Sequence, residues 1–295
     1  MLINTRQFRN TIWKYYKAHK RAFPWRETKD PYKILVSEIM LQQTQTDRVV
    51  KKYEEWLEHF PTFKDLADAP LQKVLKIWQG LGYNRRALAL KRAAAIICEK
   101  YNGKLPANYE KILELPGIGP YTAGAIMAFA FNKPFPIIET NIRTVFIYFY
   151  KKQGKVPRFV SQAASRAAPS PASGTLPLVA DADILLLVEK TLDKNNPREW
   201  YHALMDYGVM LKKTHGNLNK QSRHYTKQSS FIGSNRQIRS TILKAITLKP
   251  QTQKSILSFL ELNNVKVTSE QFQKNISALQ NEGFIVKRGQ KFDIL

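Results

Sequence analysis

Two glutamates stand where their carboxyl groups could take part in breaking a glycosidic bond. Glu38 lies in an apolar run (residues 34–41) of helical character, where the ionised form of a carboxyl group is disfavoured and a general acid is favoured at neutral pH. Glu139 follows the apolar run 135–138 and could stabilise a cationic sugar, as paired carboxylates do in glycoside hydrolysis. Each has an ordinary alternative: Glu38 could lie on a helix surface, and Glu139 could cap the helix that follows.

A glycine-rich segment between the two acids predicts a tight hairpin. Residues 115–124 read LPGIGPYTAG, in which proline and glycine interrupt one apolar run and a second run begins at once. Glycine permits positive φ and close backbone approach, and the N–H groups at the start of the second helix could bind an anion such as a DNA phosphate. We therefore expect a DNA-backbone contact at Gly117, Gly119, Tyr121 and Thr122.

The charge of the chain points to the same partner. Of its 295 residues, 47 are Lys or Arg against 23 Asp or Glu, a formal net charge of +24, which favours a polyanionic ligand. The run 212–227 is especially basic, and we expect Lys212 and Arg223 to contact phosphates. The sequence has no uninterrupted apolar run of about 18 residues and no signal-peptide pattern. We therefore expect no membrane partner and a cytoplasmic, nucleoid-associated protein.

The sequence contains few of the residue types that bind metals. The one cysteine, Cys98, excludes an internal disulfide and any all-cysteine metal or iron–sulfur site, and its apolar neighbours predict a buried thiol. The histidines show no ligand spacing. We expect no metal and no cofactor.

The elements that position these residues are mainly helical. Apolar stripes predict helices near residues 8–16, 49–57, 71–78 and 93–101, with no alternating strand before residue 280, so the fold class is all-α. An Ala/Ser/Pro-rich segment, 161–183, predicts a flexible insertion. We divide the chain into a domain over 1–230 and a module over 232–295. This module has two helices, a third opened by a capping box at 268–271, and a terminal hairpin, which is a winged-helix-like pattern.

Several blocks together resemble the helix-hairpin-helix DNA glycosylases, and most closely the MutY-type adenine glycosylases. The resemblance covers roughly residues 8–150 and 184–212. Besides the hairpin, it is carried by FPWR at 23–26, SEIMLQQTQ at 37–45, WQGLGY at 78–83 and ALMDYG at 203–208. It implies a two-lobed helical fold, double-stranded DNA as partner, and a monomer that removes adenine mispaired with 8-oxoguanine or guanine.

The resemblance also implies roles for individual residues. Because a base in a duplex must be flipped out before attack, the adenine would enter a pocket, and Gln43 would fill the space that it leaves. The residues implied to line that pocket are Trp25, Arg26, Leu41 and Tyr121. Trp25 and Arg26 could instead close a helix corner.

The implied chemistry uses both acids. Glu38 would protonate the purine and later activate water, while Glu139, with Asn141, would stabilise the oxocarbenium-like sugar. Tyr121 stands where relatives with lyase activity carry a nucleophilic lysine. We therefore expect base removal without strand cleavage.

This sequence departs from the family pattern at several places. Glu139 replaces an aspartate, and Asn84 replaces a tyrosine that would wedge beside the opposite base. The four cysteines of a [4Fe–4S] cluster are missing, and Lys212 stands at the first of them. The terminal module stands where the family has a domain that checks for 8-oxoguanine.

Two alternatives stay open. One is a mismatch glycosylase for uracil, thymine or hypoxanthine; relatives that remove thymine share the hairpin tyrosine but lack the glutamate at position 38. The other is a non-catalytic DNA-binding relative, for which Glu139 in place of aspartate is the main argument.

Overall fold

The computed structural model describes residues 4–152, 179–223, 225–227 and 229–295. They form two compact units, each built from two stretches of the chain. The first unit comprises Met1–Lys29 and Gly119–Lys227, and the second comprises Asp30–Ile118 and Gln228–Leu295. We describe each unit by itself.

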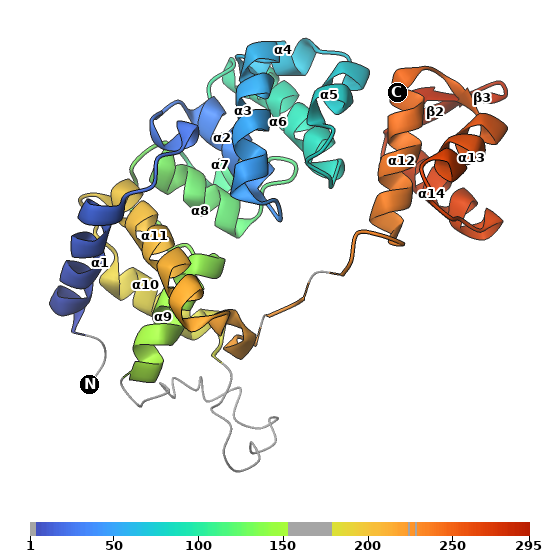
Figure 1. Cartoon of the computed structure of the whole chain (residues 1–295). Coiled ribbons are helices and arrows are strands. Elements are labelled where there is room, and N and C mark those ends of the chain that lie inside the picture. The colour runs from blue at the N-terminus through green and yellow to red at the C-terminus, as the bar shows by residue number, and fades with distance from the viewer. Residues whose placement is uncertain (1–3, 153–178, 224, 228) are drawn as a thin grey trace, which may run out of the picture. The chain divides into compact units, whose positions relative to one another are not determined.

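The first unit is helical and is centred on α11 (Figure 1). Its elements are α1 (Thr5–His19), η1 (Pro24–Arg26), α8 (Pro120–Phe129), α9 (Thr140–Lys152), α10 (Asp181–Thr191), α11 (Pro197–His215) and η2 (Leu218–Gln221). Helix α11 packs against α9, α1 and α8. At the centre, Trp200 of α11 is fully buried and meets Phe8 of α1 edge to face, with ring centroids 5.9 Å apart. Burying such large rings is a major favourable term in a core of this size.

The N-terminal part of the second unit is a further set of helices. They are α2 (Pro31–Leu41), α3 (Thr46–His59), α4 (Phe63–Asp68), α5 (Leu71–Trp78), α6 (Arg85–Tyr101) and α7 (Tyr109–Leu113). Trp56 of α3 and Trp78 of α5 meet edge to face, 5.4 Å apart, and are fully buried. Short α4 is held by a capping box between Thr62 and Asp65, which satisfies backbone donors that a six-residue helix would otherwise leave open.

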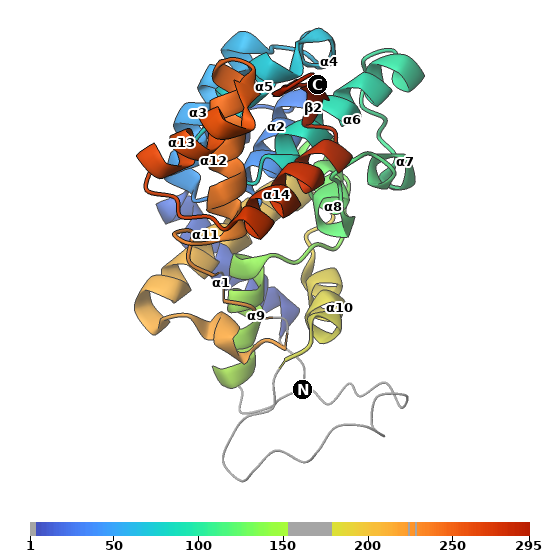
Figure 2. The same cartoon turned by 90° about the vertical axis from the view of Figure 1, so that its right-hand side faces the viewer.

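The C-terminal module completes the second unit. It contains α12 (Asn235–Leu248), β1 (Gln251–Thr252), α13 (Gln253–Leu262), α14 (Ser269–Asn281), β2 (Ile285–Arg288) and β3 (Lys291–Ile294). The strands form an antiparallel sheet of order β1-β3-β2, in which Ile285 pairs with Ile294. Figure 2 shows α12 and α14 crossing in this module, and the two helices are in contact. The predicted three helices, the capping box from Thr268 to Gln271 and the terminal hairpin are confirmed. Kinship with winged helices stays a prediction.

The module is joined to the N-terminal helices by side-chain contacts. Gln72 of α5 donates to the Thr247 carbonyl of α12 at 2.8 Å. Glu282, after α14, accepts hydrogen bonds from Arg85 of α6 and Arg239 of α12. The second unit thus combines Asp30–Ile118, from the first expected domain, with Gln228–Leu295, which contains the module.

Three expectations need correction. The strand β1 lies before residue 280 and escaped detection because two residues cannot show an alternating pattern. Cys98 is half-buried rather than buried, although burial still raises the pKa of its thiol. Residues 161–178 of the expected insertion lie outside the described residues, but 179–183 are ordered. Val179 pairs with Ser222 in an isolated parallel bridge, and α10 begins at Asp181.

Candidate active site

Helix α2 places Glu38 inside the second unit. The helix begins at Pro31, and the Asp30 side chain accepts a hydrogen bond from the Tyr32 N–H at 2.8 Å, which caps its N-terminus. From Ile34 to Met40 every residue is buried, so the helix presents no polar face there on which an acid could be solvated. Glu38 itself is only 6 % exposed. The expectation that Glu38 lies among buried residues of a helix is confirmed, and a helix-surface position for it is wrong.

The chain turns sharply where α2 ends. Leu41, the last helical residue, is half-buried, and Gln43 is exposed at the tip of the turn. Gln43 has a φ of 55°, in the left-handed region that a residue other than glycine adopts only when its surroundings hold it there. Glu38, Leu41 and Gln43 therefore sit on one helix and the turn that follows it.

The predicted hairpin is present between α7 and α8. Gly117 has a φ of +78°, and a Cβ there would lie 2.7 Å from the Cβ of Ala89, so both conformation and space demand glycine. Gly119 caps α8, and a Cβ added to it would meet nothing within 4 Å, so the space beside it is open. Tyr121 is half-buried and Thr122 is buried. A phosphate contact at Thr122 stays a prediction, and it would have to use the backbone N–H.

Glu139 and Asn141 are brought together at the start of α9. The Glu139 carboxylate accepts from the backbone N–H groups of Asn141 and Ile142, at 2.8 and 2.9 Å, and from the Asn141 amide at 3.2 Å. Desolvation raises the pKa of Glu139, against the opposing effect of these bonds and of Arg143. The helix-capping alternative is thus observed, and the same bonds hold the carboxyl group in one orientation. A catalytic role for Glu139 and Asn141 stays a prediction.

Trp25 and Arg26 belong to η1 and are both buried. Trp25 stacks face to face on Phe23, with centroids 5.1 Å apart. Both terminal nitrogens of Arg26 donate to the Asp206 carboxylate at 2.9 Å. These contacts are compatible with the alternative in which Trp25 and Arg26 close a corner between helices, and base binding by the two residues stays a prediction.

Sequence reasoning gave no role to Asp206, which lies 180 residues from Arg26 in the chain. Burial opposes ionisation of its carboxyl group, but the hydrogen bonds and charges of Arg26 and Arg21 outweigh it and lower the pKa of Asp206. A single acidic residue within a predicted helix does not indicate that its partner is an arginine so far away in the sequence.

The basic residues in the last turn of α11 and after it are exposed, as a phosphate contact requires. They are Lys212, Lys213, Lys220, Arg223 and Lys227. The segment is anchored by Asn219, whose amide donates to the Thr140 carbonyl and to Thr144 Oγ1 of α9, at 3.1 and 2.7 Å.

The donor set does not fit an iron–sulfur cluster. The sequence has one cysteine, Cys98, and it lies on α6 in the other unit. Among the described residues, no group of three or more His, Cys, Asp or Glu side chains could hold a metal ion.

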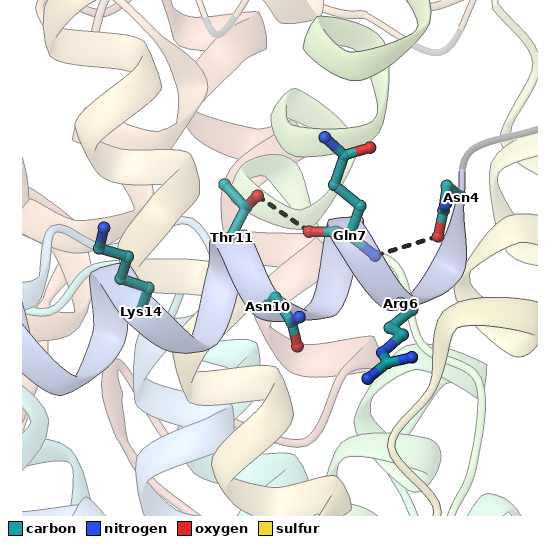
Figure 3. Close-up of a pocket in the computed structure, with 6 residues that line it drawn as sticks. All are labelled: Asn4, Arg6, Gln7, Asn10, Thr11 and Lys14. Atoms are coloured by element: carbon teal, nitrogen blue, oxygen red, sulfur yellow. Dashed lines mark hydrogen bonds between the residues drawn. The ribbon is translucent and has the colours of Figure 1, made fainter.

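A shallow hollow of about 370 Å³ lies along α1 (Figure 3). Its lining is polar, and the Gln7 backbone joins Asn4 and Thr11 by hydrogen bonds. The residues around it include none of those predicted for catalysis or binding. We therefore assign the candidate site to the motifs above.

The predicted residues divide over the two units. Glu38, Leu41, Gln43 and Gly117 belong to the second unit; Trp25, Arg26, Gly119, Tyr121, Thr122, Glu139, Asn141, Lys212 and Arg223 belong to the first. The hairpin motif connects the two along the chain. This helical architecture, with its glycine hairpin and two acids, defines a helix-hairpin-helix protein.

The comparisons agree on the family. Residues 36–169 match the model of the HhH-GPD superfamily base excision DNA repair protein. The matched residues make up a little under half of the chain, and the relatives below show the same likeness to DNA glycosylases.

Three relatives illustrate the likeness. An adenine DNA glycosylase of Buchnera aphidicola is 42 % identical over 149 residues, covering 50 % of this chain and 42 % of the relative. One of Mycobacterium tuberculosis is 35 % identical over 198 residues, covering 67 % and 59 %. The solved structure of a thermostable thymine-DNA glycosylase is 27 % identical with a TM-score of 0.58, covering 75 % of this chain and 96 % of that one.

The chain spans about half the length of the curated relatives it matches first. Among the described residues, every helix is too short or too polar to cross a lipid bilayer.

Proposed function

We propose that this chain is a monofunctional DNA glycosylase that hydrolyses the N-glycosidic bond of a flipped adenine mispaired with 8-oxoguanine or guanine. It acts on double-stranded DNA, without a metal or cofactor, as a monomer in the cytoplasm at the nucleoid. The observation that carries the proposal is Glu38, a carboxyl group 6 % exposed on α2, in a chain similar to adenine DNA glycosylases.

The chemistry assigns each acid a different task. Adenine is a poor leaving group unless a ring nitrogen is protonated, and Glu38, a buried carboxyl group on α2, is suited to supply that proton. The sugar then develops positive charge, which the Glu139 carboxylate, oriented by Asn141, stabilises. Water completes the hydrolysis, with Glu38 now acting as the base. Tyr121 replaces a lysine nucleophile, so the strand is left intact.

DNA binding draws on the remaining features. The open space beside Gly119 lets a phosphate approach the N-terminus of α8. The exposed cations in the last turn of α11 and after it add non-specific affinity. Gln43, exposed at its turn, occupies the place of the flipped base.

A second candidate is a mismatch glycosylase for thymine or uracil, which the likeness to the thymine-DNA glycosylase structure favours. A pyrimidine such as uracil can leave as an anion delocalised over its carbonyl oxygens, so it needs no buried acid. The position of Glu38 therefore favours the purine.

Single-turnover base release tests the proposal. Duplexes carrying adenine opposite 8-oxoguanine, guanine or cytosine are compared with uracil, thymine and hypoxanthine mismatches, with and without alkali. We expect alkali-dependent cleavage at adenine opposite 8-oxoguanine or guanine, and its loss in Glu38→Gln with DNA affinity retained. Release of a pyrimidine alone would establish the second candidate. Binding without release on any duplex would establish a non-catalytic relative.

A further inference from the structure

Arg86, at the start of α6, is a buried cation with an unusual set of partners. It is 9 % exposed, and its two terminal nitrogens donate to five backbone carbonyls and to one hydroxyl. Burial lowers the pKa of Arg86 to about 10, so the guanidinium remains charged at neutral pH. Its Cζ lies over two aromatic rings, 5.3 Å from the centroid of Trp78 and 5.5 Å from that of Tyr83.

One terminal nitrogen of Arg86 holds the end of the helix that carries Glu38. Nη1 lies 2.9 Å from the carbonyl oxygens of Ile39 and Met40, and it also donates to the Gln42 carbonyl. These are carbonyls at the C-terminus of α2, which have no partner within the helix and carry its negative dipole end. The cation therefore fixes where α2 ends and where the turn of residues 42–45, the Gln43 turn, begins.

The other terminal nitrogen holds a second turn. Nη2 lies 3.0 Å from Thr44 Oγ1 and from the carbonyl oxygens of Leu81 and Gly82. Leu81 and Gly82 belong to the turn of residues 79–84, the Tyr83 turn. Thr44 Oγ1 lies 3.4 Å from the Leu81 carbonyl and so joins the two turns directly.

Both turns are strained in the same way. Gln43 and Tyr83 have φ of 55° and 48°, and each lies in the left-handed region without being glycine. Such conformations cost on the order of 1–3 kcal/mol each and persist only where several contacts enforce them. The Arg86 guanidinium supplies those contacts to both turns at once.

We propose that Arg86 is a positioning residue that locks the Gln43 turn and the Tyr83 turn into one rigid element, which enters DNA as a single wedge when the target base leaves the duplex. Only the entry of this element into DNA rests on the proposed function; the lock between the two turns does not. Lysine cannot replace arginine here, because one ammonium group cannot reach both turns.

Arg86→Lys tests the lock, with Arg198→Lys as matched control. Arg198 is 8 % exposed, donates to the Ala130 carbonyl and has a pKa lowered by burial, but it lies on α11. Hydrogen exchange should accelerate by about 10-fold or more at residues 42–46 and 80–84 in Arg86→Lys and not in the control. Unchanged exchange, or loosening of one turn only, would overturn the lock.

Kinetics separate positioning from stability. Base release at saturating DNA should slow by about 100-fold, because both turns lose their geometry, while DNA affinity changes by less than about 3-fold. A weaker affinity with an unchanged saturating rate would contradict the proposal. Thr44→Val, which removes one shared acceptor and spares the cation, should slow release by about 5-fold and serves if Arg86→Lys does not fold.

A double-mutant cycle tests whether the two turns act together. Gln43→Ala removes the exposed side chain of the Gln43 turn, and Asn84→Ala removes the side chain of the last residue of the Tyr83 turn. Their effects on base release should be non-additive in the native protein and additive in Arg86→Lys. Additivity in both backgrounds would overturn the single wedge. If the native protein releases no base, the proposed function fails, and hydrogen exchange still decides whether Arg86 couples the turns.

Discussion

Gly208 of α11 packs directly on the backbone of Asn141 at the start of α9. A Cβ on Gly208 would lie 2.2 Å from the Asn141 carbonyl oxygen and 2.8 Å from its Cβ. The contact explains why a glycine interrupts a helix, where it otherwise costs about 1 kcal/mol relative to alanine. The position of Asn141, and of the Glu139 carboxylate to which it is hydrogen-bonded, depends on this close approach.

Gly208→Ala should therefore destabilise the protein by about 2 kcal/mol, although the same change in an open helix would stabilise it. The clash pushes on backbone and cannot be relieved by a rotamer change. Denaturant unfolding gives the free energy, and single-turnover base release reports the displacement of Asn141. An unchanged or increased stability would show that α11 and α9 can separate freely.

Asp206→Asn should destabilise by about 3–5 kcal/mol, because it leaves the buried Arg26 guanidinium without its carboxylate. The ion pair between Lys64 and Asp68 is the control, since both its side chains are exposed and Asp68→Asn should cost less than about 1 kcal/mol. Chemical denaturation at pH 7 measures both. Equal effects from the two variants would mean that burial of the Arg26 pair does not matter.

The raised pKa of Glu139 predicts a pH dependence of stability. The folded state binds the proton more tightly than the unfolded state, so the resulting stabilisation is full below the unfolded pKa of about 4.3 and is lost as pH rises through the folded pKa. The stability of the native protein minus that of Glu139→Gln should therefore fall as pH rises above about 4.3. Urea titrations across this range measure the difference. A difference that rises with pH would mean that the cap bonds from Asn141 and Ile142 outweigh desolvation.

The exposed cations in the last turn of α11 and after it predict salt-dependent binding. Replacing Lys212, Lys220 and Arg223 by alanine should reduce the slope of log K against log salt by about 2.7, at 0.9 for each phosphate contact. The control replaces three exposed lysines elsewhere, Lys100, Lys104 and Lys190, which makes the same change in net charge. Equal reductions in both variants would show that the slope reports net charge and not contacts of this segment.

The sequence was sufficient to predict those elements whose conformation depends on neighbouring residues in the chain. The proline and glycines of the hairpin, the capping box from Thr268 to Gln271 and the apolar run around Glu38 each gave the observed structure. Contacts between distant residues left no such signal. Asp206 and Arg26 form an ion pair although 180 residues separate them in the sequence. Arg86 donates to the Ile39 carbonyl, 47 residues away, and a backbone carbonyl acceptor cannot be recognised from the type of its side chain. Glu139 is intermediate between these two cases. Its position before α9 could be predicted, but a helix cap and a catalytic acid both place a carboxyl group there, so the sequence did not distinguish them.

The anchoring of the segment after α11 has a consequence for the conditions that the protein tolerates. Asn219 and the bridge between Val179 and Ser222 hold this basic segment against the first unit by amide and peptide groups. These hydrogen bonds form without iron or sulfide, and they contain no metal that a chelator could remove and no thiol that an oxidant could modify. The segment can therefore keep its place when iron is scarce and when an oxidant is present.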